Sequence, residues 1–336
     1  MSDVSQLSDA CFKLPLSFDV GRLRQNLEAL EALQWAPEAP FIMKTPFTTK
    51  TQIYHDGKWK GISLRSQGGS YTRTDPGGPG LDHFADSIAL GRTPYFREVI
   101  NALKCDKRSV RLLSLPAGAE IGTHVDPYHG LKFGQLRLHC PILTHPDVTM
   151  YFEERAYHWP AGELWYGDFG RPHAVKNMSF ITRIHLVIDA LISPELLSLF
   201  PSQFVDKHSR SGILMQERPV SLDPAQLNRY QCEFSIPGAL IQGLLETDDG
   251  SVPGELDGSI RIEDSQLTFC ISGTPLFGLV PIGGNRFTLT GWTPERLVIF
   301  QANTGGYFDA LIFTLRAGRN ESIIRIPIRR TCEDCL

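Results

Sequence analysis

Two histidines and an aspartate in the first half of this chain have the residue types of a metal site. His124 and Asp126 lie two residues apart in IGTHVDPYHG (121–130), and His173 follows later in GRPHAVKN. On an extended segment, side chains at positions i and i+2 project from the same face. Two imidazoles and one carboxylate can hold Fe(II) on one face and leave positions open for a co-substrate and O2. The pattern therefore favours a metal centre that activates oxygen.

Two apolar segments each carry an arginine and a histidine on one face. In QLRLHCPI (135–142) these are Arg137 and His139, and in ITRIHLVIDALI (181–192) they are Arg183 and His185, with Asp189 on the same side. Charged side chains are costly to bury without a partner. A guanidinium matches a carboxylate with two parallel hydrogen bonds, so a dicarboxylate ligand would satisfy both segments. The alternative is that these residues form satisfied ion pairs at a domain interface.

The elements that must position these residues are mostly strands. From 109 to 192 the hydrophobic period is two, and turn signals separate short apolar runs, which is typical of a barrel or a sandwich. Leucines at three- and four-residue spacing predict a helix over 19–33 with Asp19 as its cap. A second helix is expected from Thr93-Pro94 and a short third one after Ser193. The glycine-rich stretch 65–80 predicts a long loop.

The chain is expected to contain two domains. Residues 1–205 form the first, a polar and irregular stretch at 206–227 is the predicted linker, and 228–336 read as short strands of a second β-rich domain of unknown role. Seven cysteines indicate free thiols, and Cys332 and Cys335 have no second pair that would complete a zinc site.

Composition excludes several classes of partner. The net charge is −4 with no dense run of lysine and arginine, so nucleic acid and anionic membranes are not expected. No apolar run is long enough to span a bilayer, and the N-terminus lacks the pattern of a secretory signal. We therefore expect a cytoplasmic protein with a small-molecule or peptide partner.

Four motifs in a fixed order give a resemblance to a known family. LPAGAEIGTHVD, GQLRLHCPILT, AGELWYGDFGRPHAVKN and TRIHLVIDA resemble the aspartyl/asparaginyl β-hydroxylases, a family that includes bacterial cis-proline hydroxylases. The resemblance covers roughly residues 55–200. It implies an Fe(II)- and 2-oxoglutarate-dependent oxygenase on a double-stranded β-helix, a cupin-like jelly roll. The expected fold class is thus mainly β with flanking helices, plus a small C-terminal β-rich domain.

The resemblance also implies roles for single residues. His124, Asp126 and His173 would be the iron ligands, and Arg183 would bind the distal carboxylate of 2-oxoglutarate. His139 would help to bind the other end of that co-substrate. Two further residues are expected at the substrate, Arg137 at a carboxylate and Trp165 in the cavity wall. The intact carboxylate of Asp126 argues against a halogenase, in which a small residue at this position frees a site for chloride.

The expected reaction is hydroxylation of an unactivated C–H bond in an amino-acid side chain, with Fe(II), 2-oxoglutarate and O2, and with succinate and CO2 as co-products. The substrate is a free amino acid such as proline, or an Asp- or Asn-type residue in a peptide or a carrier-bound precursor. One alternative is a non-catalytic cupin-like protein that binds a metal and a dicarboxylate. Another is a structural two-barrel adaptor. The sequence leaves the oligomeric state and the choice of substrate open.

Overall fold

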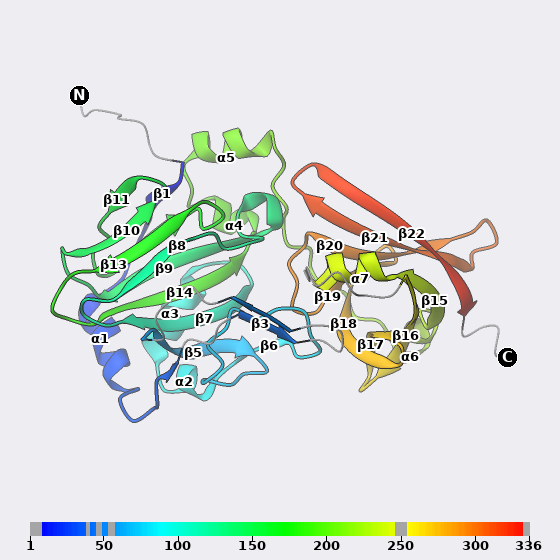
Figure 1. Cartoon of the computed structure of the whole chain (residues 1–336), viewed down its shortest axis with the longest axis horizontal. Helices are drawn as coiled ribbons and strands as arrows, with labels where there is room; N and C mark the ends of the chain where they lie inside the picture. Colours follow the sequence, from blue (N-terminus) through cyan, green and yellow to red (C-terminus); the bar gives the residue numbers. More distant parts are fainter. Residues whose placement is uncertain (1–8, 38–40, 45–48, 53–57, 246–253, 332–336) are drawn as a thin grey trace. The chain divides into compact units, whose positions relative to one another are not determined.

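The computed structural model describes residues 9–37, 41–44, 49–52, 58–245 and 254–331 (Figure 1). The chain divides into two compact units. The first contains Met1–Phe41, Gln52–Gly77 and Phe84–Met215, and the second contains Ile42–Thr51, Gly78–His83 and Gln216–Leu336. Cys332 and Cys335 lie outside the described residues.

Two antiparallel sheets form the first unit. In the larger sheet the order is β1 (Cys11–Ser17), β12 (Glu163–Gly167), β9 (Gln135–Leu143), β14 (Arg183–Leu191), β7 (Lys107–Leu115), β5 (Lys60–Gln67) and β2 (Ala36–Pro37), and β6 (Phe84–Asp86) pairs with β5. The smaller sheet has the order β11 (Arg155–Tyr157), β10 (Val148–Phe152), β13 (His173–Asn177) and β8 (Glu120–His124).

The connections between these sheets identify the fold. Strands β7, β14, β9 and β12 lie in one sheet, and β8, β13, β10 and β11 lie in the other, so the chain crosses repeatedly between the two. Side chains from both sheets, among them Leu115, Ile121 and Phe152, pack in one hydrophobic cluster between them. This arrangement is a double-stranded β-helix, and it confirms the predicted fold class.

Helices cover the outer face of the larger sheet. Helices α1 (Val20–Glu28) and α3 (Pro94–Ala102) contribute Leu23 and Phe96 to the same buried cluster as Leu138 and Leu186 of the sheet. Because side chains alternate along a strand, the opposite face of β9 and β14 is left for their arginines and histidines. The predicted separation of apolar and charged faces on these strands is therefore confirmed.

The predicted helices are present, and one of them is shorter than expected. The side chain of Asp19 accepts a hydrogen bond from the Arg22 backbone nitrogen at 2.9 Å, as predicted for the cap of α1. The helix ends at Glu28, and single turns then carry Leu30 and Leu33 to the same core. The remaining short helices of this unit are α2 (Ile88–Gly91), η1 (Leu131–Phe133), α4 (Pro194–Leu197) and α5 (Ser202–Ser209).

The glycine-rich stretch forms a loop after β5 that is tied to its surroundings. The Ser63 backbone nitrogen donates to the Tyr71 carbonyl oxygen at 2.8 Å. The Thr74 hydroxyl donates to the carbonyl oxygen of Pro37 at 3.0 Å, and Arg111 donates to the Thr74 carbonyl oxygen at 2.9 Å. The loop predicted for this stretch is present over 68–77.

The second unit is a closed β-barrel. Its strands are β15 (Cys232–Pro237), β16 (Glu255–Glu263), β17 (Gln266–Ile271), β18 (Thr274–Gly283), β19 (Arg286–Leu289), β20 (Arg296–Ala302), β21 (Phe308–Ala317) and β22 (Asn320–Thr331). Phe234, Phe269, Phe277 and Phe313 pack against one another in its core. A Cβ atom at Gly258 would lie 2.1 Å from the Phe234 ring, so only glycine fits there.

The division between the units differs in detail from the predicted domain limits. It falls between Met215 and Gln216, within 206–227, where α5 ends and α6 (Pro224–Asn228) lies. Residues 42–51 and 78–83 group with the second unit, although the sequence placed them in the first domain. Strands β3 (Phe41–Lys44) and β4 (Thr49–Gln52) form a small separate sheet, and helix α7 (Gly238–Leu245) follows β15.

Within the described ranges, none of the helices is long and apolar enough to cross a membrane. The cysteines recorded as free thiols are Cys11, Cys105, Cys140, Cys232 and Cys270.

Candidate metal centre

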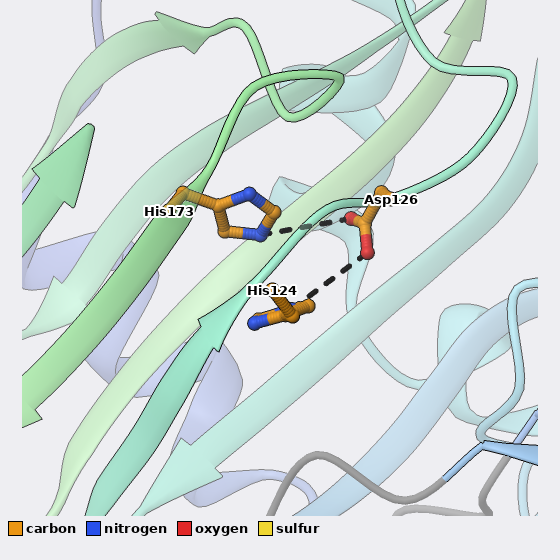
Figure 2. A group of neighbouring side chains, drawn as sticks. All are labelled: His124, Asp126 and His173. Carbon is orange, nitrogen blue, oxygen red and sulfur yellow. Dashed lines mark ion pairs between the residues drawn. The ribbon is translucent and has the colours of Figure 1, made fainter. Parts of the chain in front are cut away.

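The three predicted metal ligands converge at the end of the smaller sheet (Figure 2). His124 ends β8 and His173 begins β13, and the two residues are paired in the antiparallel register. Asp126 follows β8 after one residue. One ligand atom of each side chain lies within 4.8 Å of the others. The Nε2 atoms of His124 and His173 are 3.7 Å and 4.0 Å from the carboxylate oxygens of Asp126.

Backbone carbonyls orient both imidazoles. The Nδ1 atom of His124 lies 2.8 Å from the Gly122 carbonyl oxygen, and that of His173 lies 2.9 Å from the Arg171 carbonyl oxygen. A carbonyl only accepts hydrogen bonds, so Nδ1 carries the proton and Nε2 presents its lone pair to Asp126. This is the tautomer that a metal-binding histidine needs.

Burial and nearby charges set the protonation states of His173 and Asp126. Burial lowers the pKa of His173 to about 4, so its imidazole is neutral at physiological pH. Burial by itself would raise the pKa of Asp126, but the Arg137 guanidinium and the surrounding histidines hold that pKa below its usual value. Neutral imidazoles and an ionised carboxylate are the states that bind a divalent metal.

Arg183 is a buried cation on β14. Its exposed fraction is 2%, and its Nη2 atom donates to Nδ1 of His185 at 2.8 Å and approaches the Met150 sulfur at 4.0 Å. It forms no ion pair with any residue that the structure describes, and its Nε atom has no hydrogen-bond partner. Burial lowers the pKa of Arg183 to about 9. An isolated buried guanidinium is costly, which indicates a binding site for an anion.

His139 and His185 lie beside Arg183, and we call these three residues the cationic cluster after the charge of Arg183. Their Nδ1 atoms are 3.3 Å apart. Because Arg183 can only donate, Nδ1 of His185 accepts its hydrogen bond. Burial lowers the pKa of both imidazoles well below the usual value, so both are neutral. His185 therefore carries its proton on Nε2, which is buried and has no partner in the described structure.

Aromatic rings lie between this cluster and the three metal-ligand candidates. The Phe169 ring stacks on His139 with centroids 5.0 Å apart and meets His173 edge-on at 4.8 Å. The Phe152 ring stacks on His173 at 5.9 Å. The Phe169 ring therefore contacts both His139 of the cationic cluster and the metal-ligand candidate His173.

Comparison with known proteins agrees with this geometry. The model of the family described as Aspartyl/Asparaginyl beta-hydroxylase matches residues 22–192. This chain belongs to that family. The L-proline cis-4-hydroxylase of Rhizobium meliloti (strain 1021) is 27% identical over 179 residues, which are 52% of this chain and 58% of that protein. The match thus spans somewhat more than half the length of this relative.

Solved structures give weaker likenesses. A 2OG-Fe(II) oxygenase family oxidoreductase from Burkholderia pseudomallei matches 54% of this chain and 85% of its own, with 15% identity and a TM-score of 0.33. A Pseudomonas putida prolyl-4-hydroxylase matches 55% of this chain and 93% of its own, with 13% identity and a TM-score of 0.32.

The other two predicted site residues of this β-hydroxylase family member have partners within the chain. Arg137 donates from Nε and Nη2 to Asp189 at 2.7 Å and 3.1 Å, and its Nη1 atom donates to Asp126. The Trp165 indole donates to Glu163 at 3.1 Å and stacks on Trp159, with ring centroids 5.7 Å apart. Trp165 also lies opposite His139 in the strand register.

Sequence reasoning assigned no role to several residues at this site. Asp189 was predicted on the same strand face as Arg183, but nothing local indicated its pairing with Arg137. Arg111 and Ser109 of β7 also donate to Asp189, and the sequence of this strand contains no motif that indicates a role for them. His129 faces Asp189 with its Nε2 atom at 3.8 Å and does not join the metal-ligand candidates. Only the register of neighbouring strands would have revealed these contacts.

Gly170 permits the close approach of the loop that contains Asp126 and the loop that precedes His173. The Asp126 backbone nitrogen donates to the Phe169 carbonyl oxygen at 2.9 Å, and a Cβ atom on Gly170 would lie 2.7 Å from the His129 carbonyl oxygen. Gly170→Ala should therefore lower the free energy of unfolding by about 1–3 kcal/mol, because backbone must move. Urea unfolding measures this change. Gly91→Ala, where a Cβ meets nothing within 4 Å, is the control, and equal losses in both variants would contradict the prediction.

Proposed function

We propose that this protein is an Fe(II)- and 2-oxoglutarate-dependent dioxygenase that hydroxylates an unactivated C–H bond of an amino-acid side chain. The observation that carries the proposal is Arg183, a buried guanidinium without an acidic partner in the described structure. It contacts His185, which lies beside His139, and the Phe169 ring contacts both His139 and the metal-ligand candidate His173. Family membership supports the same class of reaction.

The donor set fits a ferrous ion. Two imidazoles present Nε2 toward one carboxylate, and such a triad leaves coordination positions open. When bound, Fe(II) supplies the binding and reduction of O2. The chain contributes the orientation of the imidazoles through Gly122 and Arg171, and the surrounding rings exclude water.

The cationic cluster fits the dicarboxylate 2-oxoglutarate. The Arg183 guanidinium would bind the distal carboxylate, and the Nε2 proton of His185 supplies a second donor beside it. His139 is neutral and its buried Nε2 atom has no hydrogen-bond partner in the described structure, so this atom would contact the other end of the co-substrate. Turnover of 2-oxoglutarate would release succinate and CO2.

The substrate would be an amino acid, free as proline or as an Asp- or Asn-type residue of a peptide or carrier-bound precursor. The proline hydroxylase named among the relatives supports the free amino acid. Trp165 and Trp159 would form part of the wall that holds it. Binding of a substrate carboxylate by Arg137 requires that Asp126 or Asp189 give up a hydrogen bond to this guanidinium.

A direct assay tests the reaction and the substrate together. The protein is incubated with Fe(II), ascorbate, 2-oxoglutarate and a panel of amino acids and peptides, and mass spectrometry follows products that have gained one oxygen. We expect one substrate class to gain oxygen, with succinate formed in equal amount. A protein that binds Mn(II) and 2-oxoglutarate but forms neither product would instead be a non-catalytic binding protein.

A further inference from the structure

Asp189 lies at the centre of a buried network of cations in the first unit. Its exposed fraction is 2%. It accepts hydrogen bonds from Ser109 at 2.6 Å, from Arg111 at 3.3 Å and from Arg137 at 2.7 Å and 3.1 Å. The donors come from β7 and β9, the two strands that flank β14 in the sheet. A carboxylate with this many donors is held in one orientation.

Arg137 connects this network to the metal-ligand candidates. It lies directly opposite Asp189 in the register of β9 and β14, and its Nε and Nη2 atoms bind the two oxygens of Asp189 as a fork. The guanidinium is planar and rigid, so this fork also fixes the direction of Nη1. That third nitrogen donates to Oδ2 of Asp126.

We propose that Asp189 is a positioning residue for the metal site, and that it acts by orienting Arg137, which in turn holds one oxygen of Asp126. The other oxygen of Asp126, Oδ1, lies 3.7 Å from Nε2 of His124 and would then face the ion. The inference rests on the proposed function in that it takes His124, Asp126 and His173 as metal ligands. It gives Arg137 a role at the metal in place of a role at the substrate.

The charges of the network support this assignment. Asp126 and Asp189 balance Arg111 and Arg137, so these four groups are formally neutral before a metal binds. Without the charge of Asp189, Arg137 would lose the fork that orients it, and its Nη1 atom would no longer be held toward Asp126. Outer partners of metal ligands typically contribute about 10- to 100-fold to metal affinity.

The test measures Mn(II) binding to the full chain by the loss of the electron paramagnetic resonance signal of free Mn(II). Asp189→Asn keeps the shape and removes the charge, and we expect its Mn(II) dissociation constant to rise about 10- to 100-fold. Asp147→Asn is the matched control, because the side chain of Asp147 is exposed and pairs with the nearby His145 at 3.3 Å. Circular dichroism confirms that both variants are folded.

A second variant separates positioning from a general loss of packing. Arg137→Lys keeps the charge but loses the fork, and it should weaken Mn(II) binding to a similar extent. If the two residues act in series, the double variant binds Mn(II) no more weakly than either single one. Full additivity, or Mn(II) affinity within twofold of wild type in folded Asp189→Asn or Arg137→Lys, overturns the proposal. Should Asp189→Asn fail to fold, Arg137→Lys alone decides.

The Mn(II) binding measurements do not depend on whether the protein turns over a substrate. If Arg137 instead binds the substrate carboxylate, Arg137→Lys raises the substrate requirement and leaves Mn(II) affinity unchanged. If the wild-type protein binds Mn(II) but hydroxylates nothing, the proposed function fails while the positioning role stands.

Discussion

Replacing Arg183 with methionine is expected to weaken 2-oxoglutarate binding by about 30-fold to several thousand-fold. The range corresponds to the roughly 2–5 kcal/mol lost when one partner of a buried, hydrogen-bonded charge pair is removed. Arg183 lacks an acidic partner in the described part of the chain, so the incoming carboxylate supplies the charge that the protein does not. Methionine is similar in length and leaves little cavity. Calorimetric titration of 2-oxoglutarate into the Mn(II)-loaded protein measures the change.

Arg183→Met should weaken 2-oxoglutarate binding without destabilising the protein, and this difference distinguishes a binding role from a folding role. Removing an uncompensated buried charge should leave the free energy of unfolding of the ligand-free protein unchanged or higher. Arg155→Met, at an exposed position of β11, is the control for the loss of an arginine. If Arg183→Met binds 2-oxoglutarate as tightly as the wild type does, the anion site lies elsewhere.

The parts of this site that depend on local sequence could be predicted. The alternation of apolar and charged residues in β9 and β14 has a period of two, so it could be seen before any pairing was known. The two-residue spacing of His124 and Asp126 likewise predicted that both side chains lie on one face of a strand. His173 could be named as the third candidate from its residue type and motif, and the pairing of β8 with β13 brings it opposite His124.

The parts that depend on strand register could not be predicted. The pairing of Asp189 with Arg137 follows from the alignment of β14 with β9, which contains an irregularity between Ile184 and His185. A shift of one residue would place Asp189 opposite another side chain. The closed barrel of the second unit is a similar case, because the pairing of β15 with β22 joins the two ends of a long segment.

The end of α1 could not be predicted, for a different reason. Leucines at helical spacing continue to Leu33, yet the helix ends at Glu28. Leu30 and Leu33 are nevertheless buried in the cluster that also contains Leu23, through turns that follow the helix. Burial of the leucines was thus predicted correctly, because it depends on hydrophobicity, whereas the helix end depends on which backbone geometry best fills the core.

Asp126→Ala is expected to abolish metal binding and hydroxylation while the protein stays folded. The substitution removes one of three candidate ligands, so the loss of Mn(II) affinity should exceed the about 10- to 100-fold effect of an outer partner such as Asp189. The fold should tolerate it because Arg137 keeps its two hydrogen bonds to Asp189 and is not left as an unpaired buried charge.

Two measurements check this prediction against its alternative. Titration with Mn(II) gives the affinity, and urea unfolding in the absence of metal gives the stability, with Asp147→Ala as the control at an exposed aspartate. If Asp126→Ala still formed product, the carboxylate would not be a ligand. If Asp126→Ala and Asp189→Asn lowered Mn(II) affinity equally, the two carboxylates would contribute alike. We expect a much larger loss of Mn(II) affinity in Asp126→Ala than in Asp189→Asn, because Asp126 would coordinate the ion directly whereas Asp189 would only orient Arg137.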